Sequence, residues 1–250
     1  MGSLDSLWLL VAGFGGGLTG SVAGLASLVS YPALLAVGLA PVAANVTNTV
    51  ALVFSSIGSI SGSRPELHDQ LPRARRLCGI SVLGGVTGGV LLLVTSSSAF
   101  ALIVPWLIGL ASLAILIRRA PRPHAPADQQ HATWLLAAGV FLIAVYGGYF
   151  GAAAGVLLLA VLLWSTTESL ARSNALKNLL LGLANGVAAV TFVLFGSVRW
   201  SAVVPLAAGF LVGGRLGPAI VRKVPAAPLR VLIACAGVGL AVHLGMDAYR

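Results

Sequence analysis

The chain is a series of long apolar runs separated by short polar loops. We read eight apolar segments, with approximate bounds 7–29, 42–61, 77–95, 99–118, 133–163, 174–195, 200–221 and 229–246. Most have the length of about 20 residues that a helix needs to cross the hydrocarbon core. They do not show the alternation of a barrel strand, and a single segment in lipid must satisfy its backbone internally. The pattern predicts an all-α, multi-pass protein of the cytoplasmic membrane.

Two of these segments are expected to be broken. The segment 133–163 is too long for one crossing, and Tyr146–Gly151 at its middle is rich in glycine. Just after segment 7–29, Tyr31-Pro32 is expected to end the first helix, because a residue before proline avoids the helical region. The stretch from Pro32 to Pro41 would then form a re-entrant turn. The residues expected at breaks or close helix contacts are Gly17, Gly20, Gly24, Pro32, Gly147, Gly148, Gly151 and Gly155.

The two halves of the chain resemble each other. A glycine-rich run occurs at 16–24 and again at 147–155, an asparagine cluster follows at 45–48 and at 174–178, and two more apolar segments end each half. This order predicts two repeats of four segments, 1–120 and 133–250, joined by a basic, proline-rich linker at 121–132. The alternative is that glycine-rich membrane helices simply look alike.

The loop charges predict that the two repeats are inverted. Loop 62–76 holds four arginines, while its counterpart 196–200 holds only Arg199; loop 95–99 has no charge, while its counterpart 222–230 has three cations. Cationic loops stay on the cytoplasmic side. Placing 62–76, 118–131 and 222–230 there puts the N-terminus outside and requires a re-entrant or broken element in each half. Two parallel repeats with eight full crossings are the rival arrangement.

Composition narrows the function. Only 8% of the residues are charged, the mean hydropathy is +1.00 and the formal net charge is +9. The cations flank apolar spans, so they indicate membrane orientation and not nucleic-acid binding. No acid lies in the middle of a span, which disfavours a hydrolase or a carboxylate proton relay. The two cysteines lack metal or redox spacing. We therefore expect no enzyme, no metal and no cofactor.

Polar side chains inside two of the segments are the candidate binding site. A buried amide without a partner costs a few kcal/mol, so these groups must face a neighbouring helix, water or a solute. Lys177 would add a positive charge next to helix N-termini, which favour anions. The alternatives are hydrogen bonding between helices and a lysine that snorkels to the interface. The candidate residues are Asn45, Thr47, Asn48, Thr49, Asn174, Lys177, Asn178 and Asn185.

The order of these motifs resembles the sulfite exporter TauE/SafE family of membrane permeases. The similar residues are Gly13–Gly24, Pro32–Leu35, Gly38–Pro41, Asn45–Asn48, Ala171–Asn178 and Gly213–Gly217. The first glycine run and the Asn45–Thr47 stretch depart from the family's usual pattern. The resemblance implies transport of small sulfur-containing anions, such as sulfite or organosulfonates like sulfoacetate.

The sequence thus favours a secondary transporter that binds a small anionic solute between its repeats. A passive anion channel would need a continuous polar lining, whereas the polar residues of this chain lie in separate clusters. A non-transporting membrane scaffold subunit would need docking surface that the short loops hardly provide. The expected partners are the solute and the lipid bilayer, with no nucleic acid, and a homodimer is one option for assembly.

Overall fold

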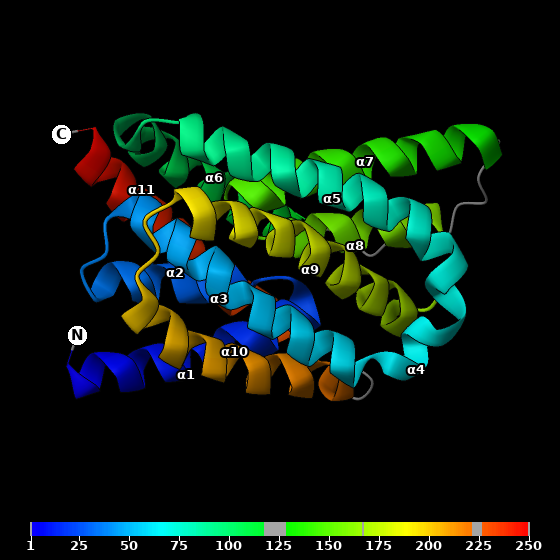
Figure 1. Ribbon diagram of the computed structural model, residues 1–250, viewed down its shortest axis with the longest axis horizontal. Coiled ribbons are helices and arrows are strands. Elements are labelled where there is room, and N and C mark those ends of the chain that lie inside the picture. Colours follow the sequence, from blue (N-terminus) through cyan, green and yellow to red (C-terminus); the bar gives the residue numbers. More distant parts are fainter. Residues whose placement is uncertain (1, 118–128, 167, 222–226, 250) are drawn as a thin grey trace.

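The computed structural model describes residues 2–117, 129–166, 168–221 and 227–249 as helices and short connections (Figure 1). The elements are α1 (Ser3–Ala23), α2 (Ala26–Ala36), α3 (Pro41–Gly62), α4 (Arg64–Leu67), η1 (His68–Gln70), α5 (Leu71–Val94), α6 (Ser97–Ile117), α7 (Gln129–Tyr149), α8 (Ala154–Ser165), α9 (Leu170–Phe195), α10 (Trp200–Val221) and α11 (Ala227–Ala248). The helices lie side by side, with both chain termini at one end of the bundle.

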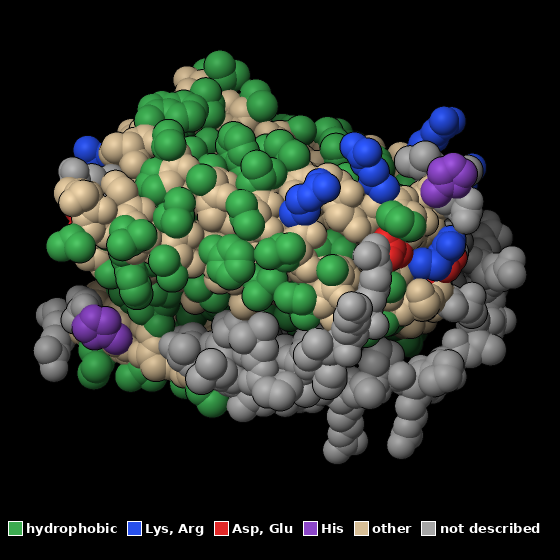
Figure 2. Space-filling view, turned by 90° about the horizontal axis from the view of Figure 1, so that it is seen from below, with side chains coloured by type: hydrophobic (Ala, Val, Ile, Leu, Met, Phe, Trp, Pro, Cys, Tyr) green, Lys and Arg blue, Asp and Glu red, His purple; other side chains and the backbone are tan. Residues whose placement is uncertain are grey.

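Five of the described helices are long and apolar enough to cross a membrane: Ser3–Ala23, Pro41–Gly62, Ala74–Val94, Leu170–Phe195 and Trp200–Val221. Apolar side chains cover much of the face in Figure 2, and most of the visible lysines and arginines lie toward one end. The described cations at that end include Arg64, Arg75 and Arg172, while Arg199 lies at the end that holds the termini. This distribution is that of a multi-pass membrane protein.

The breaks predicted in the first and fifth apolar segments are both present. Helix α7 ends at Tyr149 and α8 begins at Ala154, as the sequence predicted. In the first segment the predicted position is wrong: α1 ends at Ala23, and Pro32 lies inside α2. The chain turns instead at Gly24, whose φ of 77° lies in the left-handed region that glycine adopts without strain. Both α2 and α8 are too short to cross a bilayer alone.

Close backbone contacts at glycines join the long helices. Helix α10 packs along α1 and α3, and α5 packs along α7 and α9. Gly85 lies against the backbone of Ala184 and Gly89 against that of Ala188, so α5 and α9 run parallel. Contacts of this kind need small residues because helix packing in lipid depends on close approach.

Helices α3 and α9, in contrast, cross in opposite directions. Gly182 lies near Ser56 and Ile60, while Arg199, just beyond α9, donates its backbone N–H to Thr47 Oγ1 at 3.1 Å. The predicted linker, 121–132, and the basic loop 222–230 lie mostly outside the described residues. Gln70 of η1 donates to Arg172 O near the start of α9, and Arg215 near the end of α10 donates to Ser61 near the end of α3. These helix ends and α4 share one end of the bundle.

Candidate functional site

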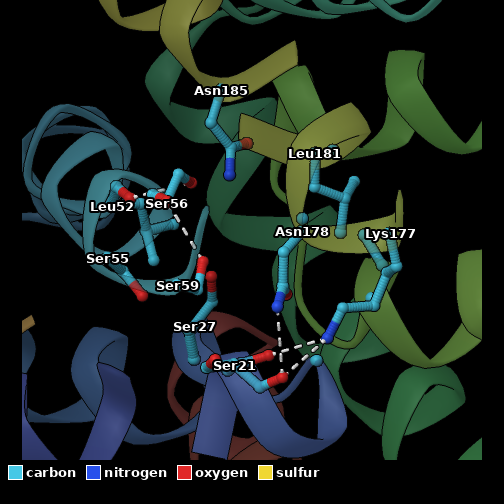
Figure 3. A pocket seen from close by; sticks show the side chains of 17 residues that line it. Ser21, Ser27, Leu52, Ser55, Ser56, Ser59, Lys177, Asn178, Leu181 and Asn185 are labelled. Carbon is cyan, nitrogen blue, oxygen red and sulfur yellow. Dashed lines mark hydrogen bonds between the residues drawn. The ribbon is translucent and has the colours of Figure 1, made fainter. Parts of the chain in front are cut away.

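A cavity of about 50 Å³, called the central cavity below, lies where the two helix breaks meet (Figure 3). Its wall comes from α1, α2 and α3 of the first half and from α7, α8 and α9 of the second. The residues that line it are Gly20, Ser21, Gly24, Ala26, Ser27, Leu52, Ser55, Ser56, Ser59, Gly147, Gly151, Ala154, Gly155, Lys177, Asn178, Leu181 and Asn185. None of these described lining residues is acidic.

Lys177 is the charged group in this wall. Its side chain is only 1% exposed, so it does not snorkel to an interface. Its Nζ donates to the carbonyls of Gly20 at 3.0 Å and Ser21 at 3.2 Å (Figure 3). Both carbonyls lie in the last turn of α1, where the dipole is negative, and Gly20 O also accepts the Gly24 N–H at 2.8 Å. The ammonium is therefore stabilised in the bundle interior by the end of a broken helix.

The N-termini of both short helices also face the cavity. Ala26 and Ser27 begin α2, and Ala154 and Gly155 begin α8, and all of them line the wall. The first N–H groups of a helix have no intrahelical acceptor, and this end of the dipole is positive. The two termini approach so closely that a Cβ on Gly24 would overlap the backbone of Gly155. Each half of the chain thus aims one helix N-terminus at the same small space.

The structure brings Lys177, Asn178 and Asn185 together in the wall and places the other candidates behind it. Asn174 Nδ2 donates to Ser21 O at 2.9 Å, and Asn178 Nδ2 lies 3.5 Å from the same oxygen. On the opposite side, Asn45 Nδ2 donates to Tyr149 O at 2.8 Å. Asparagines on α9 and α3 thus satisfy the carbonyl ends of α1 and α7, the two helices that stop at a break.

The remaining candidates on α3 do not line the cavity themselves, although Asn48 contacts the wall residue Ser27. Thr49 Oγ1 donates to Asn45 O of its own helix at 3.0 Å, and Thr47 Oγ1 accepts the Arg199 N–H. Asn48 is fully buried between two serines of α2. For these three residues the structure shows contacts within or between helices, which is the structural alternative that the sequence left open.

The sulfite exporter TauE/SafE family model matches residues 9–244. The chain belongs to this family. Its relatives include the probable membrane transporter protein ORF9 of Sinorhizobium sp., which is 26% identical over 250 residues and aligns 96% of this chain with 92% of that protein. The probable membrane transporter protein YfcA of Escherichia coli strain K12 is 25% identical over 242 residues, covering 93% of this chain and 87% of that protein. No solved structure matches the chain.

A row of serine hydroxyls forms the part of this TauE/SafE cavity that sequence reasoning missed. Ser55 and Ser59 are four residues apart and therefore share one face of α3, and Ser56 lies beside them. Ser21 and Ser27 complete the set from α1 and α2. The run Ser55-Ser56-Ile57-Gly58-Ser59 is plain in the sequence, but nothing local shows that this face of α3 meets a helix break.

Four aromatic rings from α2, α6 and the break between α7 and α8 pack together in this TauE/SafE protein. The rings of Tyr31 and Phe150 are 5.2 Å apart, and Phe100 packs on Phe150 at 5.9 Å and on Tyr149 at 5.8 Å, each edge to face. All four side chains are buried. Beyond them, Tyr31 borders a separate pocket of about 180 Å³ that reaches Pro41 at the start of α3. None of these four rings lines the central cavity.

Proposed function

We propose that this protein is a membrane permease that carries a small sulfur-containing anion by alternating access. The observation that carries the proposal is Lys177, buried in the wall of a central cavity that contains two helix N-termini and no acidic side chain among its described lining residues. Such a site favours negative charge. The family and the probable transporter relatives support transport over catalysis.

The size of the cavity favours an inorganic oxyanion over a larger organosulfonate. A water molecule needs roughly 10–15 Å³ of such a volume, so 50 Å³ holds a few non-hydrogen atoms. Sulfite, with a sulfur and three oxygens, matches this space. Sulfoacetate has twice as many non-hydrogen atoms and would require the cavity to expand.

The separation of the cavity from the neighbouring pocket favours a transporter over the channel alternative. A pore needs a continuous polar path, whereas the central cavity and the pocket beside Tyr31 share no lining residue. Binding sites near the middle of the membrane, built on discontinuous helices, are typical of secondary transporters. The scaffold alternative gives no reason for a buried lysine beside a cavity.

We also propose that the two halves are inverted repeats, and the glycine contacts support this. Gly214 meets the backbone of Ser55, and Gly85 meets that of Ala184. Positions 85 and 214 differ by 129, and so do positions 55 and 184. The same spacing relates Asn45 to Asn174, which each satisfy the carbonyl end of a broken helix in the other half.

The contacts of α1 and α7 follow the same rule. Gly213 meets Phe14 O and Gly84 meets Phe141 O; positions 84 and 213 differ by 129, and positions 14 and 141 by 127. Because α3 and α9 run in opposite directions, a repeat that relates them must be inverted. Rocking of one repeat against the other would then open the cavity alternately to each side.

Sulfite flux into proteoliposomes tests the role of Lys177. Loss of a hydrogen bond to a charged group costs about 1.5–3 kcal/mol, so we expect Lys177→Met to raise the KM for sulfite at least tenfold. Arg75→Met removes an exposed cation at the bundle end and should leave the KM unchanged. If Lys177→Met transports sulfite with wild-type kinetics, Lys177 is not part of the binding site. If wild-type flux fails to saturate or to show counterflow, the protein is a channel and not a transporter.

A carboxylate placed in the cavity provides a second test. Ser55 lines the wall and is 7% exposed. The variant Ser55→Asp would set a negative charge in the space with Lys177, and we expect it to abolish sulfite flux. Ser55→Asn has nearly the same size without the charge and should retain measurable flux. Equal activity of the two variants would mean that the cavity does not hold an anion.

A further inference from the structure

The serine hydroxyls of the cavity differ in whether their protons already take part in a hydrogen bond. Ser56 Oγ donates to Leu52 O at 3.3 Å, and Ser59 Oγ donates to Ser56 O at 3.1 Å, so both protons stay within α3. Ser27 Oγ, in contrast, donates to none of the described residues and only accepts a hydrogen bond, from Asn48. Because a hydroxyl carries one proton, that of Ser27 remains available to the cavity that the residue lines.

A buried relay fixes the orientation of this hydroxyl. Ser30 Oγ has one proton and two acceptors within reach, Asn48 Oδ1 at 2.6 Å and Ala26 O at 3.0 Å. A separation of 2.6 Å is that of an O–H···O bond and is too short for an N–H···O bond, so the carbonyl end of the amide faces Ser30. Asn48 Nδ2 then donates to Ser27 Oγ at 3.2 Å. Ser30 and Asn48 are fully buried and Ser27 is 4% exposed. Since the Ser27 lone pair faces Asn48, its proton must point away from the amide of α3.

We infer that Ser27 donates directly to an oxygen of the transported anion, and that Asn48 and Ser30 are positioning residues that aim it. This inference rests on the proposed function, because it assigns roles within the same site. The Asn48 amide is occupied at both ends by serines and does not line the cavity, so it acts through Ser27 and not on the solute.

The repeat spacing places this relay opposite the cation. Positions 48 and 177 differ by 129, the same spacing that relates Asn45 to Asn174. The second repeat therefore contributes a charged donor, Lys177, where the first repeat contributes a neutral donor held by Asn48. The anion would be held between an ammonium on one side and the oriented Ser27 hydroxyl, at the N-terminus of α2, on the other.

A double-mutant cycle on sulfite transport tests the relay. Ser27→Ala removes the donor and should raise the KM about tenfold, because the bond lost is to a charged group. Asn48→Ala should raise the KM several-fold by releasing the orientation of Ser27. In the Ser27→Ala background, Asn48→Ala should add nothing further, because coupled residues are not additive. Equal effects of Asn48→Ala in both backgrounds would mean that Asn48 contacts the anion itself and would overturn the relay.

Controls separate this inference from loss of folding and from failure of the proposed function. Ser81→Ala removes another buried hydroxyl, which donates to Leu180 O across α5 and α9, and should lower thermal stability without changing the KM. Ser27→Cys keeps the side-chain size with a weak donor and should show a raised KM in a folded protein; an unchanged KM would refute the role of Ser27. If the wild type carries no sulfite, the proposed function fails; if it does and Ser27→Ala is normal, only the relay fails.

Discussion

The contact between the two helix breaks predicts a graded response to alanine substitution at three glycines. Gly24 has a φ of 77° and lies against Gly155, so alanine meets both a strained backbone and an overlap. Gly38 has a similar φ of 85°, but an added Cβ would have no atom within 4 Å, so alanine meets the strain alone. Gly155 lies inside α8 and has no positive φ, so alanine there meets the overlap alone.

Backbone strain and overlap each have an expected cost in folding stability. Left-handed backbone costs a non-glycine residue about 1–2 kcal/mol, and overpacking costs about 1–3 kcal/mol. We therefore expect Gly24→Ala to destabilise the protein by about 2–5 kcal/mol and Gly38→Ala by about 1–2 kcal/mol. Gly155→Ala should fall between no effect and about 3 kcal/mol, since alanine also favours the helix by up to about 1 kcal/mol.

The Tm of each purified variant in detergent, followed by tryptophan fluorescence, measures these differences in stability. Sulfite flux measured on the same variants adds a functional readout, because Gly24 and Gly155 bring the two helix N-termini together and Gly38 does not. We expect Gly24→Ala to lower both Tm and flux, and Gly38→Ala to lower Tm slightly with normal flux. A Gly24→Ala variant as stable as Gly38→Ala would refute the close contact between the breaks.

Two further predictions concern the repeats and their orientation. Gly85→Ala and Gly214→Ala should lower Tm by similar amounts, because each added Cβ would overlap a backbone oxygen of the neighbouring long helix. Gly79→Ala, which has open space around the added Cβ, should leave Tm unchanged. Strongly unequal losses of Tm at Gly85 and Gly214 would argue against equivalent positions in the two repeats. In a background without the native cysteines, Ser197→Cys should react with a membrane-impermeant maleimide added outside whole cells, and Arg75→Cys only after the cells are opened, because the basic end faces the cytoplasm. Labelling of both from the same side would contradict the proposed topology.

The sequence was sufficient for features that depend on local pattern. Apolar runs identify the long helices, and the glycine-rich stretch at 146–151 locates the break between α7 and α8. Lys177 and Asn178 were found because charge and amides are unusual within apolar segments. In each case a few residues close together in the sequence are enough for the prediction.

Features that depend on contacts between distant segments could not be predicted in the same way. Pro32 suggested a helix end at Tyr31-Pro32, but that stretch lies inside α2 and the chain turns at Gly24. Whether an amide faces a solute or a helix end is decided by its partner, and Asn45 finds Tyr149 more than a hundred residues away. The sequence shows the cost of burying such an amide but not the group that offsets it.

The charge balance of the site explains how so apolar a chain would hold the proposed anion with a single lysine among the described residues of the cavity wall. The negative end of α1 lies beside Lys177 and is offset by it. The positive ends of α2 and α8 face the same cavity without a described acidic neighbour in its wall. An empty site is therefore electropositive through backbone dipoles as much as through the ammonium. Backbone dipoles need no charged side chain to be buried in hydrocarbon, and breaking one helix in each repeat supplies two of them at the same point.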